Sequence, residues 1–273
     1  MSPRERHHVR VLGRAGGPTL VLAHGLGCDQ AMWHRVVPLL VDRYQLVLFD
    51  HAGSGSAHPG AFDPSRHAAL EGYAQDVVEL LEDLALGPVV LVGHSVSATI
   101  VLLVAAERPD LVDRLVLVGP SPRYIDTDDY VGGFSAAEID ELLATMESNH
   151  LGWSRAMAPV IVGNPERPEL GEELTASFVR TDPRAMRAFA RATFLSDNRA
   201  DLARVRKPSL VVQCREDAIA PLAVGRYVHA HLARSSFVLL DAVGHCPQLS
   251  APAALVAAVD DFLSPARLSP AGS

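Results

Sequence analysis

The sequence predicts an α/β fold with a mostly parallel, doubly wound sheet. Short runs rich in leucine and β-branched residues recur along the chain, and their successive positions are apolar, as in strands buried on both faces. Between these runs, apolar residues repeat at steps of three and four, for example at Tyr73, Val77, Leu80 and Leu84, as on one face of a helix. Strands that alternate with helices in this way are typical of a parallel sheet covered by helices.

The apolar runs give the order of the strands, and one long segment interrupts them. The expected strands cover residues 19–23, 45–49, 88–92, 114–118, 209–213 and 237–240. Between about residues 121 and 203 no such run occurs, and helical periods such as Ile139 with Leu142 replace it. We therefore expect an α/β core formed by residues 1–120 and 204–273, with a helical cap inserted at residues 121–203.

Composition and charge limit the class of protein. Of the 273 residues, 48% are hydrophobic and 21% are charged, which is an ordinary globular composition. We expect disorder at the ends alone, and the tail from Ser264, with its Pro, Gly and Ser residues, is expected to fray. The formal net charge of −8 repels phosphate backbones and anionic lipids, so we expect no nucleic-acid partner and no membrane partner.

The N-terminus and the cysteines indicate a cytoplasmic protein. The N-terminal segment has no apolar stretch of the kind found in a signal peptide, and no apolar run reaches the roughly 18 residues of a membrane span. Cys28, Cys214 and Cys246 are too few and too scattered for a disulfide framework, which fits a reducing compartment. Neither C-x-x-C nor H-E-x-x-H spacing occurs, so we expect no metal.

A serine follows one of the expected strands at a sharp turn. The strand at residues 88–92 runs into the sequence GHSVS at residues 93–97, and a helical stretch at residues 98–106 comes next. This order is typical of a nucleophile elbow, in which small neighbours let strand and helix cross closely. The usual G-x-S-x-G motif ends in Gly, whereas this one ends in Ser97, which is also small. Ser95 is therefore the candidate nucleophile.

Two further residues can complete a catalytic triad with Ser95, because a serine hydroxyl needs a base and the base needs an orienting acid. Asp217 and His245 each follow an expected strand, at the edge where open α/β sheets place functional groups. The order Ser, Asp, His is that of an α/β-hydrolase and differs from that of chymotrypsin-like and subtilisin-like enzymes. Glu216, next to Asp217, and Asp241, at the end of the last strand, remain alternative acids.

Backbone donors for an oxyanion can also be named. A tetrahedral oxyanion needs one N–H from the residue after the nucleophile, here Val96, and one from an early loop. The early loop is HGLG at residues 24–27, directly after the first expected strand. Its glycines allow the main chain to approach a ligand closely, and the N–H of Leu26 is the second candidate donor.

Two other motifs carry less weight. The run DHAGSG at residues 50–55 offers G-x-G after a strand, but His58 stands where a dinucleotide fingerprint needs its third Gly. Cys246, beside His245, lacks an elbow, and a free cysteine is usually a small buried hydrophobe, so we interpret it as a packing residue. The triad requires no metal or organic cofactor, and we expect none.

The expected cap is rich in aromatic side chains, since 7 of the chain's 15 aromatic residues fall in it. Some must pack the cap onto the sheet, and the others can line an apolar pocket, the usual form of a ligand site. The seven are Tyr124, Tyr130, Phe134, Trp153, Phe178, Phe189 and Phe194.

Distinctive runs cover nearly the whole chain and include the cap. They lie at residues 24–33, 49–55, 93–97, 119–122, 132–134, 152–153, 196–202 and 244–247. In these runs the sequence resembles the RsbQ-like α/β-hydrolases, the family of the bacterial energy-stress regulator RsbQ and of the plant strigolactone and karrikin receptors. The runs in the cap are far more specific than the triad, which many unrelated hydrolases share.

The resemblance implies a V-shaped cap of four helices over a hydrophobic pocket, with Ser95, Asp217 and His245 as the triad and Leu26 and Val96 as oxyanion donors. Plant members of the family hydrolyse butenolides slowly and signal through partner proteins, and the bacterial regulator works with a phosphatase. A regulatory phosphatase is therefore an expected partner. By analogy we expect the pocket walls to include Phe134, Trp153, Phe189 and Phe194.

Three functions fit these residues. The first is a serine hydrolase that cleaves a small apolar ester or a butenolide-like lactone through an acyl-enzyme, in the service of stress signalling as in RsbQ. The alternative is a ligand receptor with slow hydrolysis, whose cap movement recruits a protein partner. The third is cofactor-free haloperoxidase or carbon–carbon hydrolase chemistry on the same triad.

Overall fold

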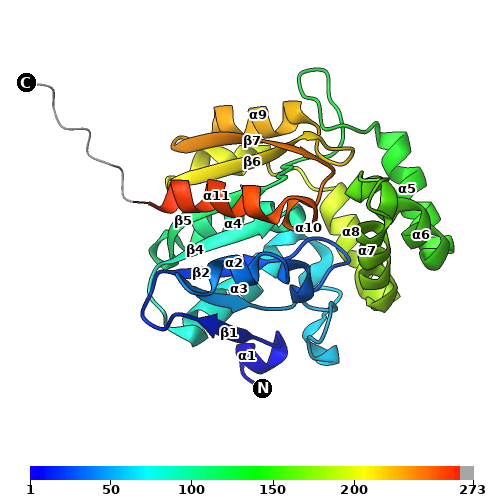
Figure 1. Ribbon diagram of the computed structural model, residues 1–273. Coiled ribbons are helices and arrows are strands. Elements are labelled where there is room, and N and C mark those ends of the chain that lie inside the picture. The colour runs from blue at the N-terminus through cyan, green and yellow to red at the C-terminus, as the bar shows by residue number, and fades with distance from the viewer. Residues whose placement is uncertain (265–273) are drawn as a thin grey trace, which may run out of the picture.

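The computed structural model describes residues 1–264, and within this range seven strands form one sheet (Figure 1). The strand order is β1-β3-β2-β4-β5-β6-β7, and all neighbours are parallel except β1 and β3. The expected mostly parallel sheet is therefore confirmed. The strands are β1 (Arg10–Gly13), β2 (Thr19–Ala23), β3 (Gln45–Leu48), β4 (Val89–His94), β5 (Val112–Val118), β6 (Ser209–Glu216) and β7 (Ser235–Val243).

Helices cover both faces of the sheet. In β2, Leu20 and Leu22 belong to one buried apolar cluster and Val21 to another, as the two-residue period of a strand requires. Burial on both faces explains why the inner strands are continuous apolar runs. The first face is covered by α2 (Val37–Leu40) and α11 (Pro252–Leu263), and the second by α3 (Leu70–Leu84), α4 (Val96–Glu107) and α9 (Leu222–His231). Two further helices of the core, α1 (Pro3–Arg6) and α10 (Pro247–Ser250), have four residues each, as α2 does.

The chain between β5 and β6 forms a helical layer at one end of the sheet (Figure 1). It comprises α5 (Ala136–Ser148), α6 (His150–Val162), α7 (Pro168–Arg180) and α8 (Pro183–Phe194). Ser135 caps α5 and shares a capping box with Glu138, and Asn149 caps α6, so polar residues set where these helices begin. We call these four helices the cap. Because β5 ends at Val118, the cap starts at the carboxyl edge of the parallel strands. The domain boundaries at residues 121 and 203 stay a prediction.

Sequence reasoning missed β1. This strand has four residues and pairs only with β3 at the edge of the sheet, and Val11 is 47% exposed. It therefore carries no buried apolar run by which a strand could be recognised. Of the tail from Ser264 that is expected to fray, residues 265–273 lie outside the described residues.

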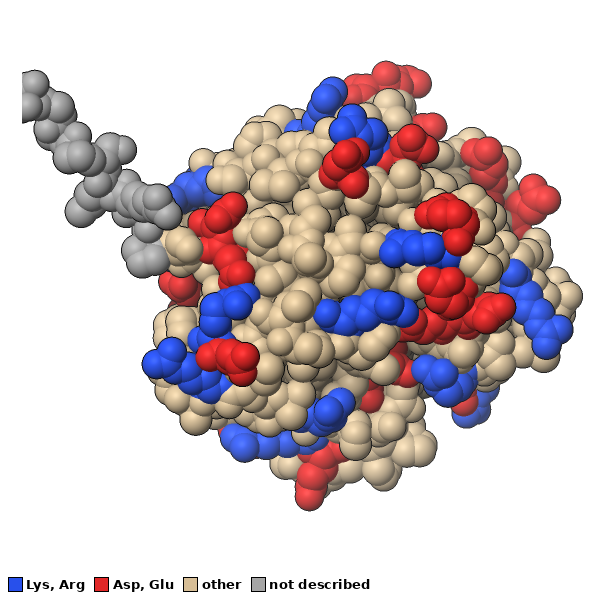
Figure 2. Space-filling model, in the orientation of Figure 1, with Lys and Arg blue, Asp and Glu red and all other residues tan. Residues whose placement is uncertain are grey.

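Three further features bear on the sequence expectations. No helix in residues 1–264 combines the length and the apolar character needed to cross a membrane. Cys28, Cys214 and Cys246 are buried free thiols. On the face shown in Figure 2, Lys and Arg side chains of the described residues are interspersed with Asp and Glu side chains instead of forming one basic stripe.

Candidate active site

Ser95 lies at a strained turn between β4 and α4. Its φ of 57° and ψ of −126° fall outside the regions that L-residues favour, as in a nucleophile elbow. The Ser95 N–H donates to the Val118 carbonyl at 2.8 Å, which ties the turn to β5. A Cβ at Gly93 would lie 2.3 Å from the Ser97 carbonyl oxygen, so only glycine lets strand and helix approach this closely. The turn leaves Ser95 7% exposed beside a cavity.

Asp217 and His245 form a buried pair. His245 Nδ1 donates to Asp217 Oδ2 at 2.8 Å, and the two side chains are 4% and 1% exposed. The other carboxylate oxygen of Asp217 accepts the N–H groups of Ile219 at 2.8 Å and Ala220 at 3.0 Å. Burial favours the neutral acid, but His245 and these two amides outweigh it and hold the pKa of Asp217 below its usual value. Asp217 is therefore a fixed carboxylate that orients the imidazole.

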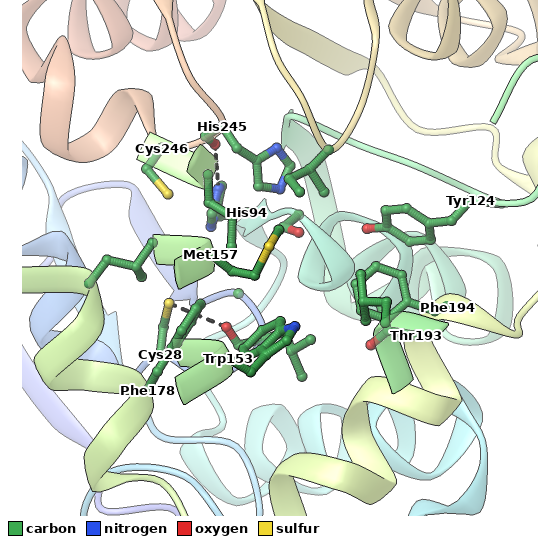
Figure 3. Close-up of a pocket in the computed structure, with 17 residues that line it drawn as sticks. Cys28, His94, Tyr124, Trp153, Met157, Phe178, Thr193, Phe194, His245 and Cys246 are labelled. Carbon is green, nitrogen blue, oxygen red and sulfur yellow. Dashed lines mark hydrogen bonds between the residues drawn. The ribbon is translucent and has the colours of Figure 1, made fainter. Parts of the chain in front are cut away.

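His245 lines the cavity, and the second nitrogen of its ring, Nε2, is available there. His245 Nε2 is buried and takes no hydrogen bond from any described residue. Since Nδ1 carries the hydrogen of the bond to Asp217, Nε2 holds a lone pair that can accept a proton. Ser95 and His245 line the same cavity, and Figure 3 shows the His245 ring among the wall residues. This arrangement is suited to withdrawing a proton from a bound reactant or from Ser95.

The alternative acids lie elsewhere. Glu216 is exposed to solvent. Asp241 is 90% exposed and pairs with Arg215 at 3.1 Å. Of the three acids considered from the sequence, Asp217 is the one that meets the histidine.

The early loop passes directly over the serine. A Cβ at Gly25 would lie 2.8 Å from His94 Nδ1 and 3.4 Å from Ser95 Cβ, so glycine permits this approach. Gly25 and Leu26 both line the cavity. Val96 is the first residue of α4, where N–H groups have no acceptor inside the helix. The structure thus brings both candidate oxyanion donors to the neighbourhood of Ser95.

The cavity lies between the cap and the sheet and is almost entirely apolar (Figure 3). About 540 Å³ of space, the open mouth included, is free of protein atoms here. Among the described residues, no Asp, Glu, Lys or Arg side chain lines it. Its walls are formed by Gly25, Leu26, Cys28, His94, Ser95, Tyr124, Leu142, Trp153, Met157, Ile161, Leu174, Phe178, Thr193, Phe194, Ile219, His245 and Cys246.

Of the four aromatic residues expected in the pocket walls, two line the cavity and two do not. Trp153 and Phe194 line the cavity. Phe189 instead stacks on Tyr73 of α3, with ring centroids 4.1 Å apart, because it lies on the face of α8 that packs onto the core. Phe134 is half-buried and packs against the apolar cluster that contains Trp153 and Phe194, outside the cavity lining. Its N–H donates to the Tyr124 carbonyl at 3.2 Å.

Sequence reasoning also missed several wall residues. Tyr124 and Phe178 were among the aromatic residues of the expected cap, but nothing in the sequence separated them from Phe189. Leu142, Met157, Ile161 and other aliphatic lining residues show only helical periodicity, which does not reveal the element opposite.

The two cavity cysteines are poor nucleophiles. Burial raises the pKa of Cys28 and that of Cys246 well above the usual thiol range. Because the thiolate is the reactive form, these thiols act as apolar wall atoms. Within the described residues, no group of three or more His, Cys, Asp or Glu side chains is arranged to hold a metal ion.

Comparisons with known proteins agree on one family. The chain matches the "Alpha/beta hydrolase family" over residues 20–259. It is 41% identical to a probable esterase of Oryza sativa subsp. japonica, over 91% of this chain and 92% of the relative. A karrikin insensitive 2 receptor of Petunia hybrida is 40% identical over the same shares.

Solved structures extend this similarity to the fold. A hydrolase from Oleispira antarctica superposes with a TM-score of 0.88 at 37% sequence identity, and the match covers 90% of each chain. Together with the sequence matches, this confirms the family resemblance and the fold class inferred from the motifs.

Proposed function

The chain belongs to the alpha/beta hydrolase family, and on this premise we propose that it is a serine hydrolase of small apolar esters or lactones. Membership of the family and its esterase relatives support ester hydrolysis in general. The substrate class, the acyl-enzyme and the roles of individual residues are our proposal.

The buried pair of Asp217 and His245 is the observation that carries the proposal. It presents an unpartnered Nε2 atom to the cavity that Ser95 also lines. A buried, oriented base beside a serine on a strained turn is the arrangement required for nucleophilic catalysis.

In the proposed reaction, Ser95 Oγ attacks the carbonyl carbon while His245 Nε2 takes the hydroxyl proton. Asp217 stabilises the imidazolium, and the N–H groups of Leu26 and Val96 stabilise the oxyanion. Collapse of the tetrahedral intermediate breaks the carbon–oxygen bond, and His245 protonates the leaving alkoxide.

Water then attacks the acyl-enzyme by the same route and restores the serine. For a lactone, the alcohol formed in the first step stays attached to the acyl group, so one hydroxy acid is the product.

The cavity supports a neutral, apolar substrate. Trp153, Phe178 and Phe194 form aromatic walls, and a charged substrate group would lose its hydration without gaining an ionic partner among the described lining residues. The relative named a probable esterase supports an ester as the substrate. Cofactor-free haloperoxidase and carbon–carbon hydrolase chemistry on the same residues remain alternatives that product analysis would reveal.

The test is product release per enzyme from a p-nitrophenyl short-chain ester and from a butenolide lactone, with Ser95→Ala alongside. Sustained turnover that the variant loses would support the proposal. Wild-type turnover by Ser95→Ala would overturn it.

A receptor is the second candidate function. The 40% identity to a karrikin insensitive 2 receptor and the cap over the cavity support it. In this case ligand binding favours one cap position, and that position recruits a protein partner in the cytoplasm, for which we propose a regulatory phosphatase. A single burst of product that then stalls, together with ligand-dependent capture of the phosphatase, would favour this function over sustained hydrolysis.

A further inference from the structure

Ser97 replaces the last glycine of the usual elbow motif, and its hydroxyl has two partners at the edge of the site. Ser97 Oγ donates to the His24 carbonyl at 2.5 Å and contacts His51 Nε2 at 2.7 Å. Ser97, His24 and His51 are all completely buried. We propose that Ser97 and His51 are positioning residues that fix the early loop at residues 24–27 and so aim the Leu26 N–H at the oxyanion.

The hydrogen-bond partners of His24 and His51 determine which nitrogen of each imidazole carries the hydrogen. The single hydroxyl proton of Ser97 goes to the His24 carbonyl, which can only accept, so His51 Nε2 must carry a hydrogen and donate to Ser97 Oγ. The His51 backbone N–H donates to His24 Nε2 at 3.1 Å, so the hydrogen of His24 is on Nδ1. Both imidazoles are neutral, and each has a defined orientation.

The network ends on the peptide that carries the candidate oxyanion donor. His24 Nδ1 donates to the Gly25 carbonyl at 2.9 Å, and the Cys28 N–H donates to the same oxygen at 3.2 Å. In a trans peptide the C=O of one residue and the N–H of the next point in opposite directions. The bonds from His24 and Cys28 hold the Gly25 carbonyl oxygen on their side of the peptide, so the Leu26 N–H points to the opposite side. Gly25 and Leu26 both line the cavity with Ser95.

The loop has a second anchor on the cap side. The Gly27 carbonyl accepts the Ser177 and Thr181 hydroxyls, each at 3.2 Å. Removing the Ser97 hydroxyl should therefore loosen the loop on its core side without releasing it, so we expect the variant to fold.

The inference rests on the proposed function, and the experiment separates the two. Ser97→Ala is compared with Thr99→Val, which removes a buried hydroxyl bonded to the Ser121 carbonyl at 2.9 Å on the same helix. Three quantities are measured: kcat and KM for p-nitrophenyl acetate, and the inhibition constant of a trifluoromethyl ketone. The ketone forms a hemiketal with Ser95 and so reports the oxyanion site directly.

We expect Ser97→Ala to lower kcat and ketone affinity by about 10- to 100-fold, less than the loss of an oxyanion donor itself, with KM changed less than about 3-fold. Thr99→Val should stay within about 3-fold of wild type in all three quantities. A second pair of variants, His51→Gln and His51→Leu, tests the positioning role independently of Ser97. The glutamine amide can replace the Nε2 donor of His51, and leucine cannot. Glutamine should retain most of the activity that leucine loses.

The positioning role would be overturned if Ser97→Ala and Thr99→Val had the same kinetic constants and the same ketone affinity. It would also be overturned if Ser97→Ala raised KM and left the ketone affinity unchanged. If Ser97→Ala does not fold, equal activity of the two His51 variants would overturn it. An inactive Ser95→Ala beside an unaffected Ser97→Ala would leave the proposed function standing. A wild-type protein that neither turns over nor binds the ketone would overturn both.

Discussion

His94 Nε2 donates a hydrogen bond to the carbonyl oxygen of His245 at 2.8 Å, which joins the residue before Ser95 to the loop that carries the candidate base. Gln248 donates to the other ring nitrogen of His94 at 3.2 Å, so the ring is held on both sides. Burial, followed by the proximity of His245, lowers the pKa of His94 to about 3, and the ring stays neutral near pH 7.

This bond gives the first prediction. His94→Leu should leave the buried His245 carbonyl unpaired and destabilise the fold by about 1–3 kcal/mol, and it should lower kcat because the base is less well held. His94→Gln, whose amide can donate to the same carbonyl, should lose less of both. Urea denaturation and ester kinetics of the two variants check this. Equal stability and activity of the two variants would contradict it.

The second prediction concerns the acid. Asp217→Asn removes the charge that holds the His245 tautomer, and kcat should fall by about 10³- to 10⁴-fold, as for other triad acids. Glu216→Gln is the matched control, since this neighbouring side chain is exposed. Turnover of a p-nitrophenyl ester measures both variants. A larger loss in Glu216→Gln than in Asp217→Asn would reverse the assignment.

The third prediction separates two phenylalanines of α8. Phe194 lines the cavity, whereas Phe189 stacks on Tyr73 in the core. Phe194→Leu should shift the preferred acyl length of p-nitrophenyl esters, because it reshapes the wall. Phe189→Leu should leave that preference unchanged and lower the free energy of unfolding by about 1 kcal/mol through loss of the aromatic stack. The opposite pattern of effects would show that the cavity walls are wrongly assigned.

The fourth prediction is a loss of stability in mild acid. Burial lowers the pKa values of His7, His24, His51 and His94 in the folded protein. Unfolding exposes each ring, whose pKa returns to about 6.5, so below that pH the unfolded chain binds more protons than the folded one. The free energy of unfolding should therefore fall as the pH drops below about 6.5, by up to about 1.4 kcal/mol per pH unit for each histidine, and for His94 the fall continues toward pH 3.

Urea denaturation between pH 7.5 and 5 measures this slope. His94→Gln, which lacks one of the four rings, should show a shallower decline than wild type. Identical slopes for the two proteins would rule out a contribution from His94.

Local sequence patterns predicted much of the fold and the positions of the chemistry. The strands β2 to β6 were expected because burial on both faces leaves a continuous apolar run, and β7 was expected from its apolar residues 237–240 although most of this edge strand is exposed or half-buried. Ser95, Asp217 and His245 were recognisable because each directly follows such a run, and parallel strands bring their carboxyl ends to one edge.

Other features depended on which elements face each other across the fold. An edge strand such as β1 buries too little to show a pattern, and helical periodicity does not say whether an aromatic residue of α8 meets the core or the cavity. From the sequence, Ser97 could be recognised only as a small residue in the elbow motif. Its bonds to the His24 carbonyl and His51 Nε2 span 73 and 46 positions of the chain. A pattern within a segment encodes which residues are buried, but the partners of a buried residue come from distant segments, so only the tertiary structure decided them.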